Sequence, residues 1–530
     1  MGWIPAIILD VDAIVKLLPA AQFALKWSLL LSITFGTTSI LGVCIYRIWF
    51  HPLSKYPGPF MAKFTNARCA YLAWTGDLHL DMWRCHLKYG DYVRYDIHGF
   101  NKNVQKAYGY QAMIHRVPST FSLLDKKEHA WKRRILSQGF SEAAIRSFEP
   151  HLITQINKFC SVICPGWKDD ESGISVQTST WSQPINMSTW CDYLFFDLIT
   201  DVVFGASYNL LGAPENRYIT KAIEKSNERI SVLVHIPELI FQRLDKKLFP
   251  RAIVARNYFI KFIKQLVGDR LQAKDKTDVF SILLTAKDPE TKKELNHYEI
   301  IAESTTMLVA GSDTSSTLMS AVFFYLSRHS DCLRKVQKEV RSRFASKDEI
   351  RLGPDLSSCR YLRACIDECL RISPPVGAAL FRDVMMGGAT IDGHFVPEGT
   401  TIGTGIYSLH HSEQFFPKPF EYIPDRWLSE DYTANPLSKK SSDTDAYVPF
   451  SMGPRGCLGK ALALTEVMLA MATVCWSMDF KLTEGQEHVG AGHPKNVLGR
   501  QRGDEFQLFD HITSAKTGPM IQFRLRTTDD

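Results

Sequence analysis

The sequence has little cysteine and little net charge. Its 12 cysteines among 530 residues are too few for a disulfide scaffold, and none form a CxxC pair at zinc-finger spacing. We therefore expect a reducing compartment. The pairs Cys160/Cys164 and Cys365/Cys369, each one helical turn apart, are predicted to be small buried side chains rather than metal ligands. The formal net charge of +6 gives nucleic-acid binding little support, so no nucleic-acid partner is expected.

Low-complexity tracts and repeats are also missing beyond residue 60. No obvious linker is longer than the "KSSDTDA" stretch at Lys440–Ala446, which predicts one large domain over residues 60–530. Apolar residues recur at helical spacing in seven stretches, whereas strand-like stretches such as Ala389–Val396 and Met520–Leu525 are short, so the fold class is mainly α with small β-sheets. The predicted helices are Lys126–Ser137, Trp190–Phe204, Ala252–Lys274, His297–Arg328, Asp331–Phe344, Tyr361–Ile372 and Leu458–Met478.

Charge is absent from Trp27–Tyr46, which runs for 20 residues and is long enough to cross the hydrocarbon core of a bilayer. We predict a transmembrane helix at 27–46, a short lumenal N-terminus at 1–26, and a stiff linker at 47–59 that contains "YPGP". No signal-peptide cleavage site follows this span. Basic residues follow it instead, so the positive-inside rule places the bulk of the chain in the cytosol.

One cysteine stands apart from the others, in the stretch "FSMGPRGCLGKALA". A single cysteine is more often a buried small side chain than a reactive group. Around Cys457, however, Gly453, Gly456 and Gly459 allow a tight turn with free backbone amides, and a helix is predicted to begin at Leu458. These donors would stabilise a thiolate. A nucleophile would also need a histidine base that the local sequence lacks, so metal ligation fits better.

Five residues of this stretch match a known pattern. Phe450, Gly453, Arg455, Cys457 and Gly459 correspond to F-x-x-G-x-R-x-C-x-G, and the chain thereby resembles the cytochrome P-450 superfamily of haem-thiolate monooxygenases. The resemblance implies the cytochrome P-450 fold, haem b (iron protoporphyrin IX) as cofactor and Cys457 as the axial ligand of its iron. It also implies that Phe450 packs beside the sulfur and that Arg455 meets a haem propionate.

A second match is "AGSDT", inside the predicted helix His297–Arg328. By itself, Gly311 is explained by helix packing or a mild kink. The resemblance implies instead that Ala310 and Gly311 form the oxygen-binding groove beside the haem. Asp313 and Thr314 would then relay the protons that oxygen cleavage consumes.

A third match joins two distant segments. Glu368 and Arg371 lie one helical turn apart in "ECLR", a spacing that on most helices gives only a surface ion pair. Together with Arg426 in "PDRW", they resemble a family network that supports the haem pocket. The resemblance implies that all three side chains are buried together.

Basic residues form the last group. The resemblance implies that His129, Arg133 and Arg382 bind the haem propionates, although a solvated basic face would also explain them. Other basic residues are expected on the exposed proximal face, where they suit docking of an acidic reductase, namely Lys132, Arg134 and Lys460.

The sequence departs from the family after "YGDYVRY" at Tyr89–Tyr95. The family runs through a strand hairpin and a short helix at this point, but here Asp96–Gly99 follow at once, so roughly 15 to 20 residues are missing. The departure is either a real loss or an incorrectly joined coding sequence.

The resemblance implies a monooxygenase that takes O2, and electrons from NADPH through cytochrome P-450 reductase, with cytochrome b5 as a second candidate donor. It would be anchored in the endoplasmic reticulum membrane, in contact with lipid, and hydroxylate or epoxidise an apolar small molecule. Stretches such as "WCDYLFFDLITDVVFG" are similar to fungal isotrichodermin hydroxylases, which implies a terpenoid or polyketide intermediate. The substrate pocket would be lined by Tyr108–Leu124, Leu308–Ala310, Gly377–Leu380 and Phe509–Thr513.

Two alternatives stay open at this point. One is a haem-thiolate isomerase or dehydratase that needs no external electrons, against which Asp313 and Thr314 argue. The other is a non-catalytic or decayed haem protein, which the missing segment after Tyr95 makes plausible.

Overall fold

The computed structural model describes residues 11–94, 103–164, 166–167, 180–273, 278–428 and 446–526. The site of the expected missing segment, between Tyr95 and Gly99, lies outside these residues. So does all but the last residue of the Lys440–Ala446 linker.

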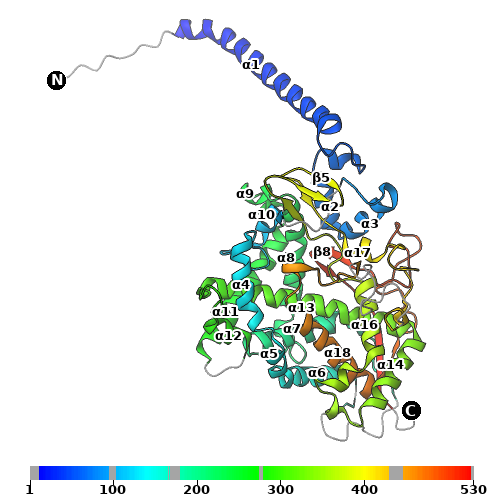
Figure 1. Cartoon of the computed structure of the whole chain (residues 1–530). Coiled ribbons are helices and arrows are strands. Elements are labelled where there is room, and N and C mark those ends of the chain that lie inside the picture. Colours follow the sequence, from blue (N-terminus) through cyan, green and yellow to red (C-terminus); the bar gives the residue numbers. More distant parts are fainter. Residues whose placement is uncertain are drawn as a thin grey trace, which may run out of the picture.

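The described chain is mainly helical with small sheets, as predicted (Figure 1). The helices are α1 Val11–Ile45, α2 Ala67–Thr75, α3 Leu78–Tyr89, α4 Lys126–Gln138, α5 Glu142–Ser147, α6 Glu149–Ile163, α7 Met187–Phe204, α8 Tyr218–His235, α9 Glu238–Phe241, α10 Leu244–Leu248, α11 Pro250–Gln272, α12 Val279–Thr285, α13 His297–Arg328, α14 Ser330–Arg343, α15 Pro354–Ser357, α16 Arg360–Ile372, α17 Ile406–His410 and α18 Lys460–Ser477.

All seven predicted helices are present as α4, α7, α11, α13, α14, α16 and α18. The longest of them, α13, begins where the sequence predicts because Asn296 and Glu299 form a capping box. The Asn296 side chain accepts the Glu299 amide at 3.1 Å, and the Glu299 carboxylate accepts the Asn296 amide at 2.9 Å. The last helix begins two residues later than predicted, at Lys460, so that Cys457 lies in the loop before it.

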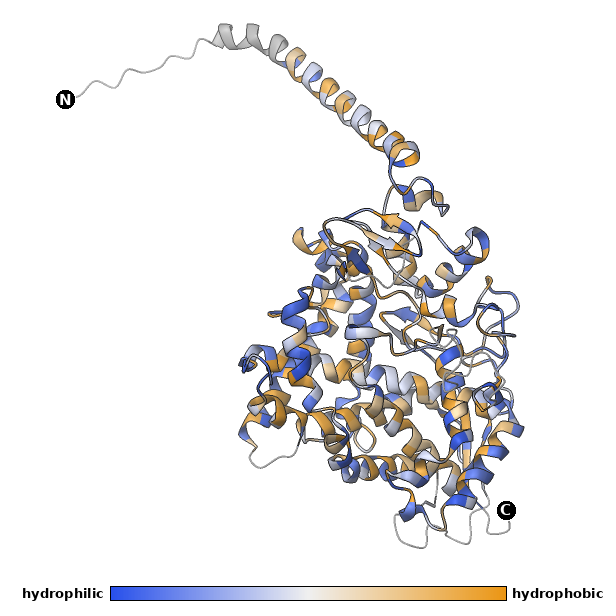
Figure 2. Cartoon of the chain, viewed as in Figure 1, coloured by the Kyte–Doolittle hydropathy of each residue, from blue (hydrophilic) through white to orange (hydrophobic). Residues whose placement is uncertain are grey.

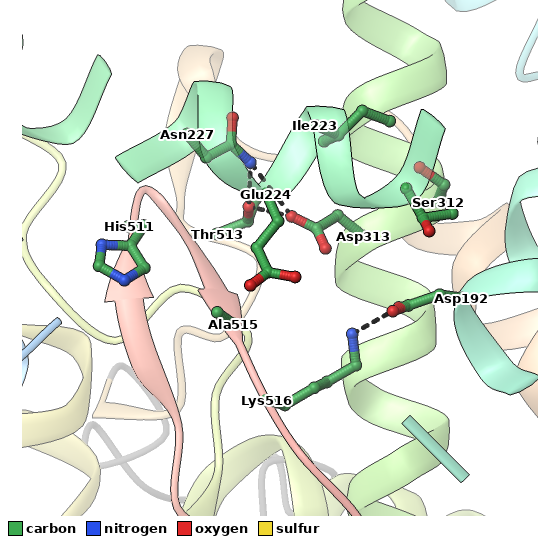
Figure 3. Close-up of a pocket in the computed structure, with 11 residues that line it drawn as sticks. Asp192, Ile223, Glu224, Asn227, Ser312, Asp313, His511, Thr513, Ala515 and Lys516 are labelled. Carbon is green, nitrogen blue, oxygen red and sulfur yellow. Dashed lines mark hydrogen bonds and ion pairs between the residues drawn. The ribbon is translucent and has the colours of Figure 1, made fainter. Parts of the chain in front are cut away.

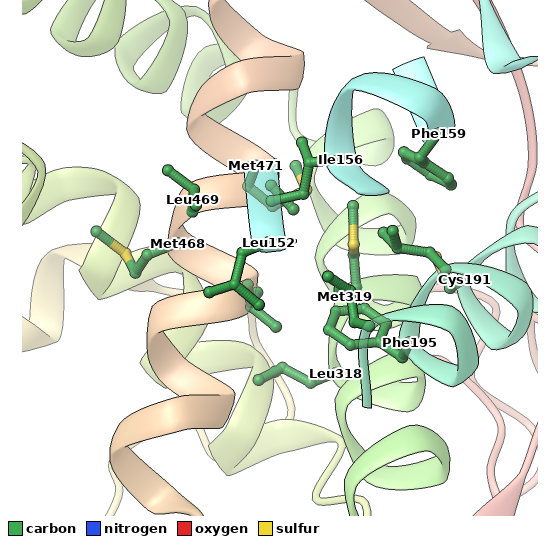
Figure 4. Packing of buried hydrophobic residues seen from close by; sticks show 14 of the residues in the cluster. Leu152, Ile156, Phe159, Cys191, Phe195, Leu318, Met319, Met468, Leu469 and Met471 are labelled. Atoms are coloured by element: carbon green, nitrogen blue, oxygen red, sulfur yellow. The ribbon is translucent and has the colours of Figure 1, made fainter. Parts of the chain in front are cut away.

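The main core lies where α13 crosses α6, α7 and α18 (Figure 4). Leu152 and Ile156 of α6 face Leu469 of α18, while Phe195 of α7 packs beside Met319 of α13. All five side chains are buried, and the buried residues of α13 gather in its C-terminal half, so apolar contacts hold that half of the helix. This packing fixes the position of the "AGSDT" stretch.

The sheets are small and antiparallel. One has the order β1-β3-β6, another β2-β10-β7, and two hairpins pair β4 with β5 and β8 with β9. Both predicted strand regions are confirmed, as the β4–β5 hairpin and as β10. The strands are β1 Val104–Lys106, β2 Ile185–Asn186, β3 Arg382–Val384, β4 Ala389–Ile391, β5 His394–Val396, β6 Thr401–Ile402, β7 Met478–Leu482, β8 Phe509–His511, β9 Thr513–Ala515 and β10 Met520–Leu525.

The N-terminal helix projects from the domain (Figures 1 and 2). The stretch Gln22–Phe50 is apolar, unburied and long enough to cross a membrane. The helix begins at Val11, so part of the predicted N-terminal segment 1–26 is itself helical. The helix α18 passes the same length and hydropathy test, but it is mostly buried in the core of the domain.

The predicted linker 47–59 is packed on the domain. Tyr56 is buried against Val384, Ile391 and Val396 of the sheets. Gly58 lies so close to Arg94 that an added β-carbon would be 2.7 Å from the Arg94 carbonyl oxygen. The end of the N-terminal helix is therefore fixed against the sheet region.

Candidate functional site

The loop before α18 holds Cys457 at the end of a closed turn. The Cys457 amide donates to the Phe450 carbonyl at 2.8 Å, and the Gly456 amide donates to the Gly453 carbonyl at 2.9 Å. Gly453 has a φ of 70°, in the left-handed region that favours glycine. The Phe450 ring is half-buried and packs against the main core.

The sulfur of Cys457 receives backbone hydrogen bonds from Gly459 and Lys460, as the glycine pattern predicts. Burial by surrounding protein raises the pKa of the thiol, and these two amides and the Arg133 charge act against that increase. The side chain is nevertheless exposed, so its outer side is accessible to a ligand. A thiol in this setting becomes a thiolate when a metal ion binds it.

The "AGSDT" stretch lies in the uninterrupted helix α13. Ala310 is exposed although most residues of the C-terminal half of the helix are buried, and Thr314 is on the same face one turn later. The Thr314 hydroxyl donates to the Ala310 carbonyl at 2.7 Å. The arrangement leaves a small side chain and a hydroxyl together on an open face.

Gly311 lies at the contact between α13 and α7. A β-carbon at this position would lie 2.7 Å from Cδ1 of Ile199 on α7, so the glycine allows close packing of α13 on α7. This close contact is what helix packing requires of Gly311, and the role of this glycine beside the cofactor stays a prediction.

The Asp313 carboxylate lies in a small polar pocket of about 30 Å³ between α7, α8, α13 and the β8–β9 hairpin (Figure 3). It accepts hydrogen bonds from the Thr513 hydroxyl and, at 3.3 Å, from the Asn227 amide. Burial raises its pKa, although the nearby Lys516 ammonium opposes that shift. Asp313 thus holds a proton more readily than an ordinary aspartate.

The same pocket reaches towards the protein surface through Glu224. The Glu224 side chain is 34% exposed and pairs with Lys221 at 2.8 Å. Lys516 is almost fully buried and pairs with Asp192 at 2.7 Å (Figure 3). Sequence reasoning missed Asp192, Glu224 and Lys516, because they come from three separate elements and belong to no local motif.

Five basic side chains gather beside the Cys457 loop, from β1, α4, β3 and the loop itself: Lys106, His129, Arg133, Arg382 and Arg455. Burial and then the Arg455 and Lys106 charges lower the pKa of His129 to about 3. Burial and then Arg455 also lower the pKa of Lys106 well below its usual value, and burial and then Arg382 lower that of Arg455 to about 10. Within the described residues, none of the five forms an ion pair with a carboxylate. The cluster is therefore short of negative charge.

The loop at 120–124 connects this cluster to α13. Glu303 of α13 accepts hydrogen bonds from the Thr120 amide at 2.6 Å and the Thr120 hydroxyl at 2.7 Å. Arg455 donates to the carbonyls of Leu123 and Leu124 at 2.8 and 3.0 Å. The α13 helix, the loop and the Cys457 turn thus form walls of one site. Lys106, which donates to the Thr120 carbonyl at 3.3 Å, is a member of the cluster that the sequence did not suggest.

Two basic residues predicted on the exposed proximal face are placed differently. Lys132 is buried and pairs with Glu299 of α13 at 2.8 Å. Arg134 donates to both oxygens of the Asp288 carboxylate, at 2.6 and 2.9 Å. Both residues fasten α4 to its neighbours, and only Lys460 of this group is exposed as predicted.

The Glu368 network is formed as the sequence suggests. Arg371 binds both Glu368 oxygens, at 2.9 and 3.0 Å, and Arg426 binds one of them at 3.1 Å. The amide of Ile423 and the indole of Trp427 complete the carboxylate's partners at 3.0 and 2.9 Å. All three charged side chains are fully buried.

An apolar cavity of about 50 Å³ lies between three of the four segments expected to line a substrate pocket. Tyr110 and Phe121 come from Tyr108–Leu124, Ala378–Leu380 from Gly377–Leu380, and Ile512 from Phe509–Thr513. The fourth segment, Leu308–Ala310, is not part of its lining. Residues of α2, α3 and α8 also line it and were not predicted, namely Ala73, Leu78, Ser231, Val234 and His235.

Comparison with known proteins agrees with this geometry. The cytochrome P450 family profile matches residues 94–504. The chain belongs to the cytochrome P450 family. It is 44% identical to cytochrome P450 monooxygenase AKT7 of Alternaria alternata, over 92% of this chain and 95% of that protein. It is 42% identical to cytochrome P450 monooxygenase poxM of Penicillium oxalicum, over 97% of this chain and 98% of that protein. A crystal structure of the cytochrome P450DA heme domain has the same fold, with a TM-score of 0.62 and 19% sequence identity. The match covers 81% of this chain and 85% of that one.

The residues present fit the haem that the P450 family implies. Cys457 offers an accessible sulfur with two amide donors, and the basic cluster lacks the negative charge that two propionates would bring. Ala310 leaves the opposing helix face open. The chemistry that haem supplies in this family is the activation of dioxygen at iron, with electrons delivered by a reductase.

Proposed function

We propose that this cytochrome P450 monooxygenase hydroxylates or epoxidises an apolar intermediate of fungal secondary metabolism, of the terpenoid or polyketide type. The observation that carries the catalytic part is the accessible Cys457 sulfur in its amide-lined turn, beside a basic cluster that forms no ion pair with a carboxylate among the described residues. The apolar lining of the cavity near Tyr110 and Phe121 supports an apolar substrate. The fungal origin of the similar monooxygenases supports the pathway class.

In this proposal the Cys457 sulfur would hold the haem iron as a thiolate ligand. Arg455, Arg382 and Arg133 would hold the haem propionates, and His129 would be a neutral hydrogen-bonding partner because its lowered pKa keeps it uncharged. Phe450 and two of the turn's three glycines, Gly453 and Gly459, would shape the space around the sulfur.

Asp313 and Thr314 would have different tasks in proton delivery. Asp313 would exchange protons with the polar pocket that reaches Glu224, since its raised pKa lets it hold a proton at a higher pH than an ordinary aspartate does. The Thr314 hydroxyl, on the open face of α13, would pass a proton to the substrate side of the helix. Glu368, Arg371 and Arg426 support the site without touching the reacting groups.

The apolar N-terminal helix supports a single-pass anchor in the endoplasmic reticulum membrane, with the domain in the cytosol. There, NADPH–cytochrome P450 reductase would deliver electrons, with cytochrome b5 as a second candidate donor. The exposed Lys460 beside the Cys457 turn suits an acidic docking partner.

The test is a reduced carbon monoxide difference spectrum of membranes that contain the full chain. The parent protein and a Cys69→Ala control should show the strongly red-shifted Soret band of a thiolate ligand, and Cys457→Ala should lose it. An unchanged band in Cys457→Ala would refute the ligand assignment. Product formation that does not depend on NADPH would favour the isomerase or dehydratase alternative.

A further inference from the structure

A second, larger cavity lies at the junction between the N-terminal helix and the domain. Its volume is about 760 Å³, and its walls come from five segments that are far apart in the sequence. They are the end of the N-terminal helix and the turn after it, the stretch at 62–66, Arg94, the α8–α9 connection, and the turn between β5 and β6. In Figure 1 this is the end of the domain from which α1 projects, near the labels α9 and β5.

The inner wall of this junction cavity is basic. Arg47, Lys63 and Arg94 line it, and within the described residues none of them pairs with a carboxylate. Their positions are set by the backbone, because Arg47 donates to the Phe64 carbonyl at 2.5 Å and Arg94 donates to the Arg47 carbonyl at 3.0 Å. Each guanidinium group has five N–H donors, so one such bond leaves donors with which a ligand could bond.

The electrostatics agree with this arrangement. Burial and then the Arg47 charge lower the pKa of Arg94, and burial and then Arg94 and Arg47 lower the pKa of His51. Two carboxylates, Glu238 and Glu398, also line the cavity. Glu398 is engaged by the Gly387 amide at 3.1 Å. Three cations against two carboxylates leave the cavity with an excess of positive charge.

The segments that line the cavity also carry, or directly adjoin, five large exposed apolar side chains, together called the apolar rim. Trp49 and Phe50 lie at the end of the N-terminal helix, Phe60 and Met61 lie just before the stretch at 62–66, and Phe241 ends α9. Each of these side chains is more than half exposed. Several large exposed apolar side chains on the segments that line a basic cavity are unusual for a surface that faces water, and they suit the interface of a membrane.

We propose that the junction cavity binds the phosphate-bearing headgroup of an anionic phospholipid from the leaflet that the N-terminal helix enters. Arg47 and Arg94 donate hydrogen bonds to the phosphate. The planar guanidinium group of arginine can bind two phosphate oxygens at once, which the ammonium group of lysine does less well. The apolar rim contacts the acyl chains of the same lipid. The bound lipid links the helix, the β5–β6 turn and α9, and so fixes the tilt of the domain on the membrane. The proposal relies on the membrane anchor of the proposed function but not on its chemistry.

The test uses the detergent-solubilised full chain, titrated with short-chain phosphatidylserine, short-chain phosphatidylcholine or inorganic phosphate, with binding followed by the shift in thermal unfolding. The parent protein should bind short-chain phosphatidylserine at least about tenfold more tightly than either other probe. Arg94→Gln and Arg47→Gln should each remove that preference. Arg360→Gln, a change at an exposed arginine on α16, should keep it.

Three results would overturn the proposal. One is equal binding of phosphatidylserine by Arg94→Gln and the parent protein. Another is binding of inorganic phosphate as tightly as of the lipid, which would show a site for soluble anions. The third is extraction of the chain from membranes by alkaline carbonate, which would show that it has no membrane anchor. Arg94→Lys, which keeps the charge, should recover part of the affinity and thus distinguishes loss of binding from misfolding. The carbon monoxide spectrum of each variant reports on the haem site separately.

Discussion

Replacing Glu368 with glutamine should strongly destabilise the domain. The carboxylate is fully buried and accepts five hydrogen bonds, from two arginines, one backbone amide and one indole. Burial by itself raises the pKa of Glu368, but Arg371 and Arg426 outweigh it and lower the pKa below its ordinary value. The group is therefore ionised in the folded protein, and Glu368→Gln leaves two buried guanidinium groups without a counter-charge.

Breaking such a buried pair costs about 3–5 kcal/mol, which raises the unfolded fraction by roughly a hundredfold or more. The assay is urea unfolding of the solubilised full chain followed by tryptophan fluorescence, with Glu421→Gln as the matched control. Glu421 is an exposed carboxylate that pairs with Lys418 at 3.2 Å, so the control should change stability by at most about 0.5 kcal/mol. The pKa of Glu368 is lowered on folding, so its stabilisation is present at neutral pH. It is lost as the pH falls through the folded-state pKa, below the ordinary value of 4.5. Equal stability of the two variants at neutral pH would refute this reasoning.

Three further predictions concern protons. Thr314→Ala should keep the carbon monoxide spectrum and still consume NADPH and oxygen, but divert much of this flux to hydrogen peroxide; unchanged product per NADPH with substrate bound would exclude the relay. Lys516→Met removes a charge that lowers the pKa of Asp313, so the pH profile of product per NADPH should move to higher pH, and an unmoved profile would contradict the role of the pocket. Burial raises the pKa of Glu303 to about 7, so this group makes the fold less stable as the pH rises from about 4.5 to 7. The thermal stability of Glu303→Gln relative to the parent should therefore increase from about pH 5 to about pH 8, and a constant difference would show that Glu303 does not titrate there.

The basic residues show which contacts can be predicted from local sequence and which cannot. His129 and Arg133 lie one turn apart on a predicted helix, and both join the cluster near Cys457. Lys132 is adjacent in sequence but points to Glu299 of α13, and Lys106 enters from β1. A run of basic letters cannot separate these cases, because the partner of each side chain lies on another element.

The sequence by itself determined seven of the longer helices, because apolar spacing and capping are local properties that each helix carries in its own residues. The sequence also predicted the turn around Cys457. Three glycines allow a tight turn, and the helix that follows it begins with free backbone amides that can donate to the sulfur. Tertiary structure alone decided that Gly311 packs on Ile199 and that Asp313 shares a pocket with residues from two other helices and a hairpin. It alone created the basic junction cavity, whose lining residues are up to about 350 positions apart. These features depend on contacts between distant segments, and such contacts follow from how whole helices pack rather than from any short stretch of sequence.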